Sequence, residues 1–99
     1  MLLEGKNAVI YGAAGSIGGA VARAFAAEGA RVHLAARTLE SLEEVAQEIR
    51  AAGGAAETAQ VDALDERAVD EHADAVAMSA GSLDISFNLI SHPRTGRAR

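Results

Sequence analysis

The stretch AVIYGAAGSIGGAVARAF, Ala8 to Phe25, passes from β-branched residues through a cluster of glycines into an alanine-rich segment. The run NAVIY, which Gly12 stops, is typical of a strand buried on both faces of a sheet. From Ser16 onward the sequence predicts a helix that Gly29 terminates. Its apolar residues recur every four positions, at Ile17, Val21 and Phe25.

The rest of the chain repeats this alternation of strand and helix. RVHLAA, from Arg31, predicts a second strand, AETAQVDA a third that ends near Asp62, and SLDISFNLIS a fourth. The helix after the second strand has Thr38 as its candidate N-cap and stops at Gly53 and Gly54. The next helix ends at Gly81. Their predicted apolar faces are Leu39, Leu42, Val45 and Ile49, and Val69, Ala73, Val76 and Ala80.

The resulting order, β-α-β-α-β-α-β with short connections, predicts an α/β fold of parallel strands joined by right-handed crossovers. In a doubly wound sheet the third crossover returns to the other side of the first strand, which gives the strand order 3-2-1-4. The first two helices then cover one face and the third covers the other. No repeat or linker divides the chain.

Composition narrows the class of partner. The chain has 99 residues, a net charge of −5 and no cysteine. The negative charge argues against nucleic acid and acidic membranes, and the missing cysteine excludes disulfides and thiolate metal sites. Glu4 and Lys6 interrupt the apolar N-terminus, so we expect neither a signal peptide nor a membrane span, and a cytoplasmic protein.

The glycines after the first strand predict a dinucleotide site. Gly12 suits a tight turn, the Gly15/Ser16 pair lets backbone N–H groups approach a pyrophosphate, and Gly18 lets the helix lie close to the strand. Ile17, between Ser16 and Gly18 at the start of the helix, belongs to the same predicted cofactor-binding set. The helix that starts there directs free N–H groups and a positive dipole end at the phosphates. Packing of the helix on the sheet is the alternative reason for the small residues.

The end of the second strand bears on the choice of cofactor. An acidic residue there would accept hydrogen bonds from the adenosine ribose, whereas an arginine accommodates a 2′-phosphate. The sequence reads LAART, with Ala36 followed by Arg37 and no carboxylate. This favours NADP(H), with NAD(H) as the alternative, unless Arg37 is only a solvated loop residue.

With these residues together, the chain resembles the short-chain dehydrogenase/reductase family, through LEGKNAVIYGAAGSIG, ARVHLAART, VDA and LDISFN. The resemblance implies the cofactor-binding half of a Rossmann fold in an oxidoreductase that transfers hydride to or from a carbonyl or alcohol. It also implies that Asp62, with Ala63, contacts the adenine ring and that Asn88 supports the sheet and the cofactor pocket. The usual Asn-Asn-Ala-Gly reads Asn88-Leu89-Ile90-Ser91 here.

No catalytic residue is assigned. The family's Tyr-x-x-x-Lys pair and serine are absent, because Tyr11 and Lys6 are the only tyrosine and lysine and stand in the wrong order. His33, His72 and His92 lack the spacing of a metal site or of a nucleophile–base pair, so we expect structural or solvent-facing histidines, with His92 the one nearest the nicotinamide side. The chain as given is therefore expected not to catalyse the reaction.

We divide the chain into a nucleotide-binding half-domain, residues 1–91, and an irregular basic tail, residues 92–99. SHPRTGRAR is either a natural tail or out-of-frame sequence after a truncation, and the abrupt end of the resemblance favours the second interpretation. An unpaired fourth strand predicts self-association through the sheet edge. A non-catalytic dinucleotide-binding module or sensor is the alternative to a reductase fragment.

Overall fold

The computed structural model describes residues 2–13 and 15–89, which form a parallel four-stranded sheet in the order β3-β2-β1-β4. In chain order the elements are β1 (Asn7–Tyr11), α1 (Ser16–Ala27), β2 (Arg31–Ala36), α2 (Leu39–Ala51), β3 (Ala55–Gln60), α3 (Glu66–Ala80) and β4 (Ile85–Asn88). The predicted fold class and strand order are confirmed.

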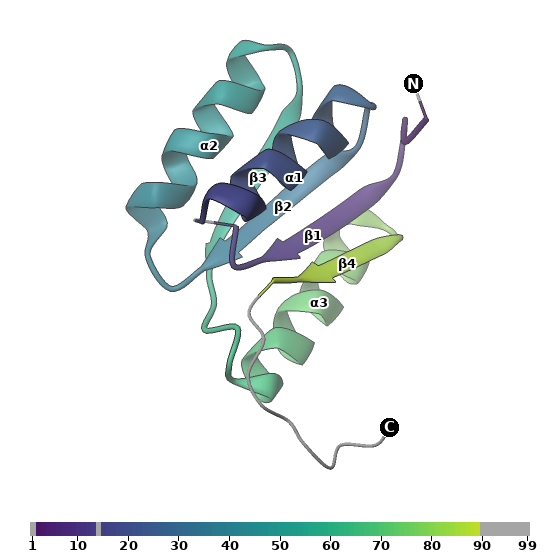
Figure 1. The fold of residues 1–99 in the computed structure, drawn as a ribbon. Coiled ribbons are helices and arrows are strands. Elements are labelled where there is room, and N and C mark those ends of the chain that lie inside the picture. The colour runs from purple at the N-terminus through teal and green to yellow at the C-terminus, as the bar shows by residue number, and fades with distance from the viewer. Residues whose placement is uncertain (1, 14, 90–99) are drawn as a thin grey trace.

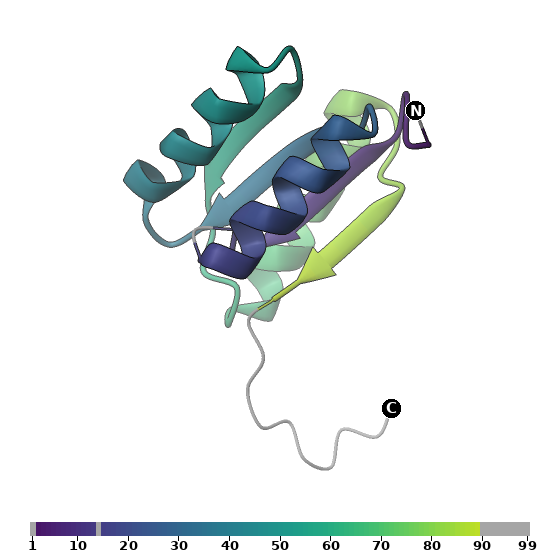
Figure 2. The same ribbon diagram turned by 45° about the horizontal axis from the view of Figure 1, so that its top comes forward.

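Helices cover both faces of this sheet, as the doubly wound topology requires. Helices α1 and α2 lie on one face and α3 lies on the other (Figures 1 and 2). The parallel strands bring the carboxyl ends of β1, β2 and β3, and with them the loops that follow, to the same edge. That edge is where open α/β sheets of this kind bind ligands.

Each face of β1 contributes to a separate hydrophobic core. Ala8 and Ile10 join the cluster beneath α1 and α2, whereas Val9 and Tyr11 join the cluster beneath α3. All of these residues are fully buried, because β1 has a paired strand on each side and helices above and below. The prediction of a strand buried on both faces is confirmed.

The buried face of α1 is made by smaller residues than the apolar spacing indicated. Ile17 is 68% exposed, while Gly18 and Ala22 are buried against the sheet and Gly19 is buried toward Val45 of α2. The helix lies so close to β1 that only small side chains fit between them. Leu39 is likewise 41% exposed, because it begins α2 at the carboxyl edge, beyond the core.

The predicted helix limits hold closely, and one cap differs. Helix α1 ends just before Gly29, which adopts a φ of +94° that glycine tolerates without a steric cost. Thr38 is the N-cap of α2, but its side chain makes no capping hydrogen bond. Residues 90, 91 and the predicted tail, 92–99, lie outside the described residues.

Candidate functional site

The turn from β1 into α1 is held against the end of β2. Gly12 has a φ of +82°, and its N–H donates to the carbonyl of Ala35 at 2.9 Å. The N–H of Ala13 donates to the same carbonyl at 3.3 Å. A side chain at Gly18 would bring its Cβ to 2.5 Å from the Gly12 oxygen. The fold itself therefore requires glycine at Gly12 for conformation and at Gly18 for packing.

Gly15 differs from these two glycines. It is the N-cap of α1, with φ −77° and ψ 169°, an extended conformation open to any residue. A Cβ at Gly15 would have the Gly12 oxygen at 3.9 Å as its nearest contact, which is ordinary van der Waals separation. Neither conformation nor internal packing explains glycine here. Its missing side chain leaves open space at the start of α1.

That space belongs to a hollow of about 310 Å³ at the carboxyl edge of the sheet. The loops after β1, β2 and β3 all contribute to it. The lining residues are Gly12, Gly15, Ala36, Arg37, Thr38, Ser41, Val61, Asp62, Ala63 and Leu64. The helices α1 and α2 both begin beside it, so the positive ends of their dipoles meet at the hollow. This arrangement favours an anionic ligand.

Two charged side chains line the hollow, and they behave differently. Within residues 2–13 and 15–89, the guanidinium of exposed Arg37 has no hydrogen bond or ion pair. Asp62 instead uses Oδ1 to accept the N–H of Leu64 at 3.0 Å, which fixes the loop after β3. The N-cap of α3 is Asp65, whose side chain accepts the N–H of Ala68 at 3.2 Å. Asp65, not Asp62, is thus the acidic cap of this helix.

The structure brings together part of the predicted set. Gly12, Gly15, Arg37, Asp62 and Ala63 all line the hollow. Ser16, Ile17 and Gly18 form the first turn of α1 next to Gly15. Asn88 lies at the end of β4, in register with Tyr11, at the same edge but outside the lining residues.

Sequence reasoning missed Ser41 and Leu64, and took Thr38 only as a helix cap. Ser41 follows Arg37 by one helical turn, and Leu64, 48% exposed, follows the predicted Asp62-Ala63 pair. Position relative to Arg37 could have identified Ser41. Nothing in the sequence marks Leu64, because the loop after β3 sets its direction.

The tyrosine and two histidines lie outside the hollow, with Tyr11 and His33 on the sheet face that α3 covers and His72 on α3 itself. The Tyr11 hydroxyl is 3.0 Å from Nδ1 of His72 and 3.2 Å from the Val69 carbonyl oxygen. Burial, with Asp70 contributing, raises the pKa of Tyr11 to about 12. Burial lowers the pKa of both His33 and His72. Tyr11 is fully buried, which fits a structural role.

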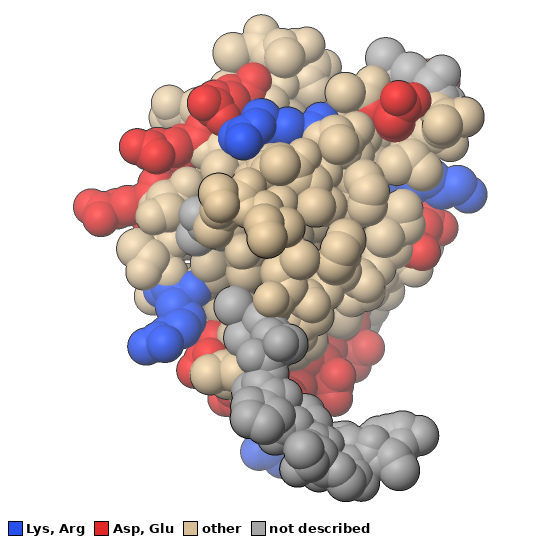
Figure 3. All heavy atoms as spheres, viewed as in Figure 1, with Lys and Arg blue, Asp and Glu red and all other residues tan. Residues whose placement is uncertain are grey.

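The remaining histidine, His92, lies outside the described residues. Among the residues that the structure does describe, no cluster of three or more His, Cys, Asp or Glu side chains could hold a metal ion. Within the same part of the chain, no helix combines the length and the hydropathy of a membrane span. The face over α1 and β4 is largely uncharged, with acidic and basic side chains at its margins (Figure 3).

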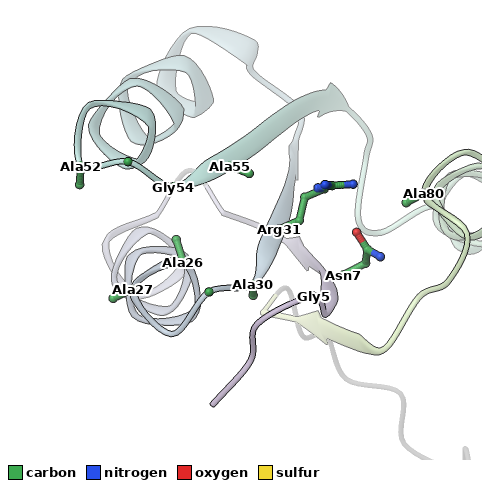
Figure 4. A pocket seen from close by; sticks show the side chains of 12 residues that line it. Gly5, Asn7, Ala26, Ala27, Ala30, Arg31, Ala52, Gly54, Ala55 and Ala80 are labelled. Atoms are coloured by element: carbon green, nitrogen blue, oxygen red, sulfur yellow. The ribbon is translucent and has the colours of Figure 1, made fainter. Parts of the chain in front are cut away.

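A second hollow, of about 400 Å³, opens at the amino edge of the sheet (Figure 4). Alanine and glycine make up most of its lining, with Asn7 and Arg31 as the polar members. The carboxyl-terminal ends of α1 and α2 lie here, so the helix dipoles present their negative ends. Although it is larger, this hollow is the less suitable one for an anion.

The fold is a Rossmann-type α/β fold, because it combines a sheet in the order 3-2-1-4 with a glycine turn after β1 and a hollow at the carboxyl edge. The chain belongs to the short-chain dehydrogenase family, whose model matches residues 6–95. It is 45% identical over 86 residues to the uncharacterized oxidoreductase YxbG of Bacillus subtilis, covering 87% of this chain and 32% of that protein.

Solved structures agree with this assignment. A metagenomic short-chain oxidoreductase in complex with NADP is 41% identical, with a TM-score of 0.82, over 87% of this chain and 39% of that one. An NAD⁺-bound xylitol dehydrogenase is 32% identical, with a TM-score of 0.84, over 93% of this chain and 35% of that one. The chain thus spans about a third of the length of such relatives.

Proposed function

We propose that the carboxyl-edge hollow binds NADP(H), and that the whole protein uses this cofactor to transfer hydride to or from a carbonyl or alcohol substrate. Gly12, Gly15 and the first turn of α1 would hold the pyrophosphate. Gly15 carries the proposal, because its missing side chain leaves room at a helix N-terminus that residues 2–13 and 15–89 do not fill.

The remaining roles follow from position around the hollow. Asp62 and Ala63 would contact the adenine ring, and Oδ2 of Asp62 has no hydrogen bond among the described residues. Ser16, Ile17 and Gly18 would place the helix N–H groups. Asn88 would support the nicotinamide end, since β4 ends there beside Tyr11.

Arg37 supports NADP(H) over NAD(H). Its guanidinium has no internal partner in the described part of the chain, and it lies beside the start of α2, where an anion is stabilised. No carboxylate ends β2 to accept hydrogen bonds from an unphosphorylated ribose. Relatives bound to NADP and to NAD⁺ both exist, so the choice rests on this arginine.

The chemistry would be divided between cofactor and protein. The bound nicotinamide would supply or accept the hydride. The residues of this chain would bind the phosphates, orient the adenine and keep the dinucleotide extended along the carboxyl edge. None of the described side chains is proposed to move a proton, because Tyr11 is fully buried under α3.

A charge swap at Gly15 tests the proposed site. Gly15→Asp and Gly15→Asn have the same shape, and both residues are favoured N-caps, so both variants should fold. Bound NADPH is measured by its fluorescence at low salt. We expect Gly15→Asp to bind at least about tenfold more weakly than Gly15→Asn, because its carboxylate faces the phosphates.

NADPH affinities of both variants equal to that of the unaltered chain would show that no phosphate lies near Gly15. An unaltered chain that folds but does not bind NADPH would overturn the proposed function itself. Circular dichroism on each variant separates these results from a loss of folding.

We also propose that β4 pairs with a second copy of the chain. In the described residues β4 has a paired neighbour on one side only, and Phe87 in it is 37% exposed. Such an edge is a template for another strand. Light scattering should show concentration-dependent association that Ser86→Lys reduces, since charged residues protect edges. A monodisperse monomer at high concentration would contradict this.

A further inference from the structure

A hydrogen bond from the Gln60 side chain holds the turn that contains Arg37. Gln60 is the last residue of β3, and its Nε2 donates to the carbonyl oxygen of Arg37 at 2.8 Å. The N–H of Val61 donates to the preceding carbonyl, that of Ala36, at 2.9 Å. The carbonyls of Ala36, which ends β2, and of Arg37, which follows it, therefore accept hydrogen bonds from Val61 and Gln60 at the end of β3.

The hydrogen bond from Gln60 to the Arg37 carbonyl matters because no side chain caps the start of α2. Thr38 has the extended backbone of an N-cap, with φ −119° and ψ 116°, yet it makes no capping hydrogen bond. The contrast is α3, where Asp65 caps its own helix through the N–H of Ala68. The direction in which the chain leaves β2 thus depends on β3 through Gln60.

The direction of that turn decides where the Arg37 side chain points. Arg37 is exposed, and its guanidinium has no hydrogen bond or ion pair within residues 2–13 and 15–89, so only its backbone restrains it. Gln60 is not among the residues that line the hollow. Gln60 therefore acts on a ligand there only through its neighbours, and the lining residue that its side chain contacts is Arg37.

We propose that Gln60 is a positioning residue that holds Arg37 for a 2′-phosphate and so sets the preference between phosphorylated and unphosphorylated dinucleotides. This inference rests on the proposed binding of NADP(H) in the carboxyl-edge hollow. The requirement is for a donor, because the group opposite Gln60 is a carbonyl oxygen. A side chain of equal length without an N–H fills the same space but cannot donate the hydrogen bond that holds the turn.

The test compares Gln60→Met with Gln47→Met, a matched change at an exposed glutamine on α2. Dissociation constants for NADPH and NADH are measured by fluorescence titration. We expect Gln60→Met to weaken NADPH binding about three- to tenfold, as loss of one hydrogen bond allows, and to leave NADH binding unchanged. Gln47→Met should alter neither.

A double-mutant cycle separates positioning from general stability. In an Arg37→Met background, adding Gln60→Met should have no further effect on the ratio of NADPH to NADH affinity. An equal loss for both cofactors, or the same change in ratio with and without Arg37, would overturn the inference. If the unaltered chain folds and binds neither cofactor, the proposed function fails first.

A measurement without ligand tests the positioning itself. Amide hydrogen exchange at Leu42, Glu43 and Glu44, the first amides of α2 with carbonyl partners inside the helix, should be faster in Gln60→Met than in the unaltered chain or in Gln47→Met, because the start of α2 loses the hydrogen bond that holds it. Exchange in the first turn of α1 should not change. Unchanged exchange at the start of α2 would overturn the positioning role whether or not a cofactor binds.

Discussion

The two edges of the sheet each have a hollow with one arginine, Arg31 at the amino edge and Arg37 at the carboxyl edge, and they differ in what they can bind. Glycine and alanine form most of the lining at the amino edge and less than half of it at the carboxyl edge. Helices end at the first and begin at the second, so their dipoles have opposite signs. Hollow size would favour the amino edge, whereas electrostatics favours the carboxyl edge.

The glycines of the two edges also differ in whether the fold itself requires them. At the amino edge the chain itself accounts for each one. Gly5, Gly29 and Gly53 have positive φ, and a Cβ on Gly54 would lie 2.8 Å from Ile49 Cγ2. At the carboxyl edge Gly15 has neither reason. A glycine that its own chain does not require is better evidence of a ligand than a count of glycines.

The largest effect should separate Gly18 from its neighbour Gly19 in α1. A Cβ on Gly18 would lie 2.6 Å from Ala13 Cα, while one on Gly19 has the flexible Arg23 guanidinium at 3.4 Å as its nearest contact. Gly18→Ala should lower the free energy of unfolding by about 2 kcal/mol or more. Gly19→Ala should raise it by up to about 1 kcal/mol through helix propensity.

Urea unfolding followed by circular dichroism gives both free energies. Similar values for the two variants would mean that α1 does not approach β1 as closely as the structure places it, and that the turn at Gly12 is looser. The close packing that supports the carboxyl edge would then need revision.

The second effect compares the two arginines directly. Arg37→Asp should weaken NADPH binding by about tenfold or more, since a charge-assisted contact to the 2′-phosphate becomes a repulsion, and should affect NADH much less. Arg31→Asp makes the same charge change at the amino edge and should leave the ratio of the two affinities unaltered. Equal losses of both cofactors in Arg37→Asp would remove the basis for preferring NADP(H).

The smallest expected effect is a loss of stability in acid that involves His33, in the amino half of the sheet. Nε2 of His33 lies 3.5 Å from Oδ1 of Asn7. Burial lowers the pKa of His33 from 6.5, against Glu57, which raises it, while His72 and Arg31 lower it further. The unfolded chain therefore binds this proton more readily, and the contribution of His33 to stability falls as the pH drops below 6.5.

Melting temperatures at pH 7.5 and pH 5 test this expectation. We expect the unaltered chain to melt lower at pH 5, and His33→Gln to show a smaller difference because glutamine cannot take up the proton. The carboxylate of Asp84, whose pKa is lowered from 3.8 chiefly by the hydrogen bond from the Asn7 N–H, keeps its contribution to stability at pH 5 and loses it only as the pH falls below 3.8. An identical acid response in His33→Gln would assign the effect elsewhere.

Most of the fold could be predicted because hydrophobic pattern and helix stops are local properties. The run from Asn7 to Tyr11 marked a doubly buried strand, and Gly29, Gly53 and Gly81 marked helix ends. The exposed positions of Ile17 and Leu39 could not be read the same way. Helical spacing gives a face, but how closely a helix approaches the sheet decides which residues of that face are covered.

The features of the candidate site also separate into those that local sequence sets and those that tertiary contacts set. Sequence alone determined the order of strands and helices along the chain, the glycine turn and the presence of an arginine after β2, because these depend on residue type at short range. The strand order then followed from the doubly wound topology. Only the tertiary structure brought Ser41 and Leu64 to the hollow, left Gly15 without an internal reason and placed Gln60 against the Arg37 carbonyl. Those relations join strands that are distant in sequence, so parallel pairing and the close approach of α1 to β1 had to fix them.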